Sequence, residues 1–147
     1  MGPLAPEHGV MSVGGELTPS PALEERLEHL RLEFLAEFLG QATRRHPDNF
    51  DALVELATVL TRLGRYQEGL EADERLVGLA PEDPTVHYNL ACSLALLGRV
   101  DPAFKALERA IELGYGDGDQ LAHDADLESL RALPRFQVLV ERLRASG

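Results

Sequence analysis

The sequence predicts an all-α protein in which antiparallel helix hairpins stack side by side, with a capping helix at each end. Three observations support this fold class. Apolar residues recur at steps of three and four from Pro21 onward, which is the spacing of one helix face. Residues 47–80 and 81–114 repeat one another at a fixed offset of 34 residues. Glycine and proline recur in these repeats where helices are expected to stop and start.

The chain begins with a segment of low periodicity that leads into the first predicted helix. Residues 1–20 are rich in proline, glycine and serine, so we expect a disordered tail. Residues 21–46 predict a helix, because Pro21 suits its first turn and the basic residues at 44–46 suit its end. Its apolar face comprises two lines, Leu23, Leu27, Leu30 and Phe34, and Leu35, Leu39 and Ala42. We interpret it as a capping helix or a degenerate repeat.

Each of the two repeats predicts one helix hairpin. The Leu-Ala pair at 56–57 recurs at 90–91, and the Gly-Arg pair at 64–65 recurs at 98–99. The glycine of the second pair allows the sharp turn between two helices. The alanine of the first pair lets the two helices approach closely, and a leucine there would overpack the hairpin.

Residues 115–145 predict a divergent closing unit, which completes a single domain over 21–145. Pro134 can begin its last helix. That helix carries an apolar face that can cover the end of the stack, and the face comprises Phe136, Leu139, Val140 and Leu143.

The repeats resemble tetratricopeptide repeats, a family whose unit is a 34-residue helix hairpin. The matching positions are Leu53, Leu56, Ala57 and Leu60 in the first repeat, and Ala103, Leu107 and Ala110 in the second. Asp73 departs from the pattern, since a bulky apolar residue is usual there, and Tyr115 replaces a closing proline. The resemblance implies a right-handed α-α superhelix, a solenoid whose first helices line a concave groove.

That groove is the expected binding site for a peptide or protein segment. By register, its residues are Asp51, Val54, Glu55, Thr58 and Arg62 in the first repeat, Tyr88, Asn89, Cys92 and Leu96 in the second, and His123 and Asp126 in the closing unit. We expect Thr58, Tyr88 and Asn89 to anchor the ligand. Asp51 and Glu55 favour a neutral or basic partner.

Charge and composition narrow the function further. A net charge of −11 argues against nucleic acid and against an anionic membrane surface as the main ligand. No apolar run approaches the length of a membrane span, and the start lacks the features of a secretory signal. We therefore expect a cytoplasmic protein, with its oligomeric state left open.

The sequence contains no recognisable catalytic motif, and we expect neither enzymatic activity nor a cofactor or metal. Cys92 has no basic neighbour in the sequence and is interpreted as a small packing residue. The acidic loop at 117–128 lacks the ligand spacing of a calcium site and is interpreted as solvated. Asp73 is expected to contact His87 or Tyr88, which follow on the next helix.

The sequence thus favours a scaffold or adaptor that binds a peptide or protein segment in its groove. Two alternatives stay open at this point. One is a chaperone of secreted proteins, because some such chaperones are small, acidic and built from tetratricopeptide repeats. The other is a structural module that associates with itself through the helix at 21–46.

Overall fold

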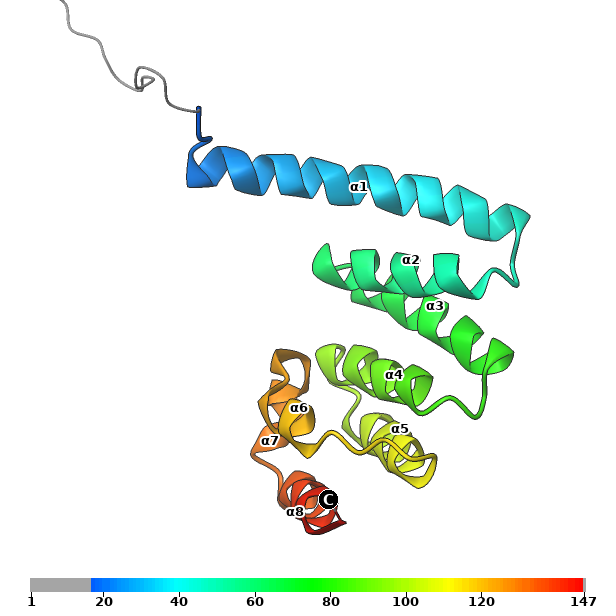
Figure 1. Cartoon of the computed structure of the whole chain (residues 1–147), viewed down its shortest axis with the longest axis vertical. Helices are drawn as coiled ribbons and strands as arrows, with labels where there is room; N and C mark the ends of the chain where they lie inside the picture. The colour runs from blue at the N-terminus through cyan, green and yellow to red at the C-terminus, as the bar shows by residue number, and fades with distance from the viewer. Residues whose placement is uncertain (1–16, 147) are drawn as a thin grey trace, which may run out of the picture.

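In a computed structural model, residues 17–146 are described, and this part of the chain is helical throughout, with short turns between the helices (Figure 1). The predicted all-α class is confirmed. The elements are α1 (Pro21–Arg45), α2 (Phe50–Arg62), α3 (Tyr66–Leu79), α4 (Pro84–Leu96), α5 (Val100–Glu112), α6 (Gly118–His123), the 3₁₀ turn η1 (Ala125–Leu127), α7 (Glu128–Arg131) and α8 (Pro134–Ser146). Most of the predicted tail, residues 1–16, lies outside the described residues.

α1 is one unbroken helix of 25 residues. The Ser20 hydroxyl caps it by accepting the Leu23 N–H at 3.2 Å, and Pro21 stands in its first turn. One stripe of the helix, which includes Leu32 and Ala36, is buried against α2. The prediction of one broad apolar face is wrong in part, because only the line of Leu35, Leu39 and Ala42 lies on the side of α1 that packs against α2. The first line, Leu23, Leu27, Leu30 and Phe34, is exposed.

The two repeats form the hairpins α2–α3 and α4–α5, and α3 of the first packs against α4 of the second. Asn49 and Asp83 cap α2 and α4 with their side chains. Gly64 and Gly98 make the turns inside the hairpins with φ of 77° and 74°. This left-handed conformation favours glycine, because a Cβ atom would crowd the following carbonyl.

The closing unit is packed onto the second hairpin. The predicted covering residues of α8 are all buried, and they share a core with Phe104 of α5. On the surface, Arg135 lies over the Phe104 ring at 4.2 Å and pairs with Asp101 at 3.0 Å. η1 packs against α4. The closing unit therefore places the acidic loop beside the first helix of the second repeat.

Between Leu17 and Ser146, no helix combines the length and the apolarity needed to cross a bilayer.

Candidate functional site

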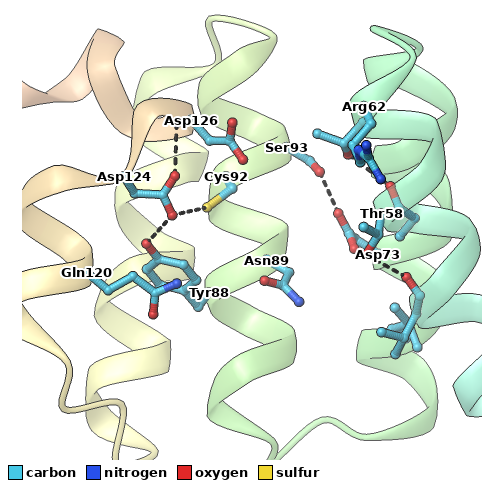
Figure 2. A pocket seen from close by; sticks show the side chains of 14 residues that line it. Thr58, Arg62, Asp73, Tyr88, Asn89, Cys92, Ser93, Gln120, Asp124 and Asp126 are labelled. Carbon is cyan, nitrogen blue, oxygen red and sulfur yellow. Dashed lines mark hydrogen bonds between the residues drawn. The ribbon is translucent and has the colours of Figure 1, made fainter. Parts of the chain in front are cut away.

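A pocket of about 380 Å³ opens between the first hairpin, α4 and the closing unit (Figure 2). Its residues come from α2, α3 and α4 and from the segment 120–126. They are Val54, Ala57, Thr58, Thr61, Arg62, Asp73, Leu76, Tyr88, Asn89, Cys92, Ser93, Gln120, Asp124 and Asp126. The pocket thus joins three units of the chain, each of which contributes polar side chains.

Tyr88 forms one wall of the pocket and is held on both sides. Its hydroxyl donates to Asp124 Oδ2 at 2.6 Å, and its ring stacks on Tyr115 with the centroids 4.4 Å apart. Burial, together with the hydrogen bond to Asp124, raises the pKa of Tyr88 far above its usual value. Tyr115 in turn donates to Gln120 Oε1 at 2.8 Å. Because Tyr88 is only 3% exposed, it is a fixed wall of the pocket.

Asp124 is the residue on which the hydrogen bonds of this wall converge (Figure 2). Besides Tyr88, its carboxylate lies 3.9 Å from the Cys92 thiol and accepts the Asp126 N–H at 3.0 Å. Its backbone carbonyl accepts a hydrogen bond from Arg131 at 2.6 Å. The interpretation of the acidic loop as merely solvated is therefore wrong at this residue, which is fixed by side-chain and backbone contacts.

Cys92 is 7% exposed, in keeping with its predicted packing role. Burial and the nearby Asp124 carboxylate raise the pKa of the thiol. The thiol therefore stays protonated at neutral pH and is a poor nucleophile.

A second carboxylate, Asp73 of α3, stands across the pocket from Asp124. It is 3% exposed and accepts the Ser93 hydroxyl at 2.5 Å. Burial raises its pKa to about 6. His87 and Tyr88 have other hydrogen-bonding partners, since His87 bonds to the Pro81 carbonyl oxygen at 2.7 Å and Tyr88 bonds to Asp124, and the expected contact of Asp73 with one of them stays a prediction.

Three further side chains complete the lining. Thr58 donates its hydroxyl to the Val54 carbonyl at 3.0 Å, one turn earlier on α2. Arg62 is drawn toward α1, where it pairs with Glu28 at 2.5 Å. Asn89 lies between the Asp124 cluster and Asp73, and Figure 2 draws no hydrogen bond from it to the other lining residues. Its amide can therefore bind the backbone of a ligand.

The pocket is acidic. Its lining includes the carboxyl groups of Asp73, Asp124 and Asp126 against one guanidinium, and that guanidinium is engaged by Glu28. Burial, and then the neighbouring Asp124, also raise the pKa of Asp126. The raised pKa values of Asp73 and Asp126 both show that negative charge is costly in this pocket. A cation entering the pocket would therefore be stabilised.

The predicted groove residues divide into two sets. Seven line the pocket: Val54, Thr58, Arg62, Tyr88, Asn89, Cys92 and Asp126. Four others, Asp51, Glu55, Leu96 and His123, do not. Of these, Leu96 lines a separate shallow depression beside η1, and the His123 ring bonds to the Asp119 carbonyl oxygen at 2.9 Å.

The groove prediction omitted several pocket residues, notably Asp73, Ser93, Gln120 and Asp124. One signal for Asp73 was visible, because an acid stood where the repeat pattern has a bulky apolar residue. The sequence carried no such signal for Asp124, whose position depends on how the irregular closing unit packs against α4.

Among residues 17–146, Cys92, Asp124 and Asp126 form a group that could together hold a cation, since one ligand atom from each lies within 4.8 Å of the others. A thiol must lose its proton to bind a metal. In this structure the Cys92 thiol and the Asp126 N–H both lie against the Asp124 carboxylate, so the three residues form a hydrogen-bonded wall.

Comparison with known proteins agrees with the fold. Two models described as tetratricopeptide repeat match residues 35–84 and 84–113, which together make up more than half of the chain. The chain is also 29% identical over 127 residues to a protein of Arabidopsis thaliana whose name describes it as chloroplastic. That alignment covers 84% of this chain and 36% of the plant protein, so the chain corresponds to about a third of that relative.

Proposed function

Because the chain belongs to the tetratricopeptide repeat family, whose domains mediate protein–protein interactions, we propose that its pocket binds a peptide segment of a partner protein through a basic side chain. The observation that supports this proposal is the placement of three carboxyl groups on the two sides of Asn89, whose amide makes no hydrogen bond to the other lining residues in Figure 2. The amide can pair with a peptide group of the ligand. The carboxylates can pair with a lysine or arginine.

Electrostatics favour a basic ligand over a neutral or acidic one. Asp73 and Asp126 resist ionisation because burial partly removes their carboxyl groups from water. A guanidinium or ammonium group would offset that penalty, whereas a ligand carboxylate would add to it. Asp51 and Glu55 are exposed on the same helix as Thr58 and extend the negative charge along α2.

We propose binding rather than catalysis as the role of this pocket. Two groups that could act as nucleophiles, the Cys92 thiol and the Tyr88 hydroxyl, both have raised pKa values and both bond to Asp124. A third, the Ser93 hydroxyl, donates to Asp73, but both of these side chains are only 3% exposed, which leaves little access for a substrate. A nucleophile needs a lowered pKa or an adjacent base that is free to accept its proton. Burial instead raises the pKa of the Cys92 thiol and of the Tyr88 hydroxyl, which makes both poorer nucleophiles.

The proposal is tested with labelled pools of short peptides, each pool randomised around one fixed central residue. We expect the arginine and lysine pools to bind, with an affinity that falls as salt is added. The glutamine pool should bind weakly and the glutamate pool not at all. Equal binding of the glutamate and arginine pools would contradict the assignment of a basic ligand.

Variants locate the binding in the pocket. Asp126→Asn should weaken binding of the arginine pool about tenfold, which equals about 1.4 kcal/mol. Asn89→Ala should weaken the arginine, lysine and glutamine pools alike, because the amide serves the peptide backbone. Glu141→Gln removes the same charge from the exposed surface of α8 and should change nothing. If Glu141→Gln weakens binding as much as Asp126→Asn does, the pocket is not the site.

A further inference from the structure

The exposed side of α1 carries a continuous apolar stripe. The stripe comprises Leu23, Leu27, Leu30, Phe34 and Phe38, whose exposed fractions lie between 46% and 70%. The Phe34 and Phe38 rings stack with their centroids 6.4 Å apart. At 1.5 Å per residue the stripe runs for about 22 Å. Contiguous exposed apolar surface of this kind marks an interaction site.

The stripe lies on the side of α1 that faces away from the rest of the fold. At about 100° per residue, its centre stands about 150° around the helix from the stripe centred on Leu32, Leu35 and Ala36 that packs on α2. The N-terminal part of α1 also extends past the end of α2 (Figure 1). α1 is thus apolar on two opposite sides, and the described chain covers only one of them.

Charged residues flank the stripe in a definite pattern. Arg26, Glu33 and Glu37 border it on one side, and Glu24 and Arg31 border it on the other. Between residues 24 and 33, each side has one acid and one base seven residues apart. Along the sequence, the base comes first on the side of Arg26, and the acid comes first on the side of Glu24.

This pattern is self-complementary when two copies of α1 run in opposite directions. We propose that a second copy of the chain docks on the stripe, with the two α1 helices antiparallel. Leu27 then faces Leu30 of the partner subunit, and Leu23 faces Phe34 of the partner subunit. In that register Arg26 meets Glu33 of the partner subunit, and Glu24 meets Arg31 of the partner subunit. The two-fold symmetry forms each pair twice.

The parallel arrangement lacks this complementarity. In a parallel pair of helices, position 26 of one helix faces position 31 of the other. Arg26 would then meet Arg31 of the partner subunit, which is repulsive. The antiparallel arrangement is therefore the one that the charges favour.

The flanking charges set direction and register more than strength. Arg31 is already bound by Glu28 at 2.8 Å, and Glu33 lies 3.7 Å from Arg65. Exposed ion pairs contribute little to stability but discriminate against wrong alignments. The apolar stripe supplies the affinity, and its short length predicts a dimer that dissociates on dilution.

The dimer does not depend on the proposed ligand, but it would determine how many pockets one partner can reach. The residues that line the pocket belong to α2, α3, α4 and the segment 120–126, so docking through α1 leaves them uncovered. A dimer would present two pockets, and a partner with two basic segments would gain avidity from both.

Sedimentation equilibrium of the full chain, over a wide range of concentrations, tests the dimer. We expect the mass to rise from monomer to dimer with concentration. Leu30→Glu should weaken dimerisation at least about tenfold, since it places a charge in an apolar contact. Val138→Glu is the matched control, because Val138 is 59% exposed on α8, and it should dimerise as the parent does. Circular dichroism checks that both variants remain helical.

A charge exchange tests the antiparallel register. Arg26→Glu alone and Glu33→Arg alone should each weaken the dimer several-fold, because each sets like charges opposite one another twice. An equimolar mixture of the two variants restores both pairs and should dimerise as well as the parent. The rescue excludes loss of the Arg65 contact as the cause, since Glu33→Arg is present in the mixture too.

Three results would overturn the proposal. The first is a parent chain that stays monomeric at every concentration. If Leu30→Glu also lowers the thermal stability of that monomer, another segment of the same chain covers the stripe. The second is a dimer that Leu30→Glu leaves intact. The third is a mixture of the charge variants that dimerises no better than either alone, which would refute the antiparallel register.

Discussion

At the scale of single residues, the pocket is built from polar groups that are buried and bonded to one another. Tyr88 and Cys92 share the Asp124 carboxylate, and Ser93 holds Asp73. Such groups seldom stabilise a fold more than apolar residues of the same size would, because burial removes them from water. Their presence together in one pocket fits the proposed role in recognition.

Asp73 gives this argument a measurable consequence. Its pKa of about 6 lies above the 3.8 of an ordinary aspartate, so the folded chain binds this proton more tightly than the unfolded chain. The contribution of Asp73 to stability is therefore lost as the pH rises from about 4 to about 6.

Asp73→Asn should remove that loss and leave the variant about 1–3 kcal/mol more stable than the parent at neutral pH. Urea unfolding of both chains at about pH 4 and about pH 7 gives the difference in free energy of unfolding between parent and variant at each pH, which should be larger at about pH 7. The same difference at both pH values would show that Asp73 ionises normally.

At the scale of elements, the sequence was most informative where local rules decide the structure. The hairpins could be predicted because Gly64, Gly98 and the capping residues act within a few positions of themselves. The two apolar lines of α1 could not be told apart, because periodicity reports that a side is apolar and not what covers it. The exposed line became visible only once α2 was seen to pack on the other.

The two roles of glycine in these elements predict opposite effects of one substitution. Gly98→Ala should lower the free energy of unfolding by about 1 kcal/mol, because alanine is strained at a φ of 74°. Gly78→Ala should raise it by about 0.5–1 kcal/mol, because Gly78 lies inside α3 and a Cβ atom there meets nothing within 4 Å. Chemical denaturation of both variants checks the pair, and a change of the same sign in both would refute this interpretation.

At the scale of the whole molecule, the pocket exists because three units meet, and that geometry limits how much of it the sequence predicts. Thr58 and Asn89 could be placed by repeat register, since each occupies a defined position on a first helix. Asp124 could not, because the closing unit departs from the repeat and its irregular turn sets the position of the carboxylate. The proposed dimer would add a second level of organisation, with the paired α1 helices joining two such pockets.

The most direct test of the basic-ligand pocket compares one arginine peptide, taken from the binding pool, with the same peptide carrying citrulline in place of arginine. Citrulline keeps the shape of the side chain and removes its charge. In amide-resolved NMR titrations, we predict that the arginine peptide shifts the signals of Asn89, Ser93 and Asp126, and that the citrulline peptide leaves them nearly unchanged. Equal shifts with both peptides, or shifts confined to α1, would contradict the account.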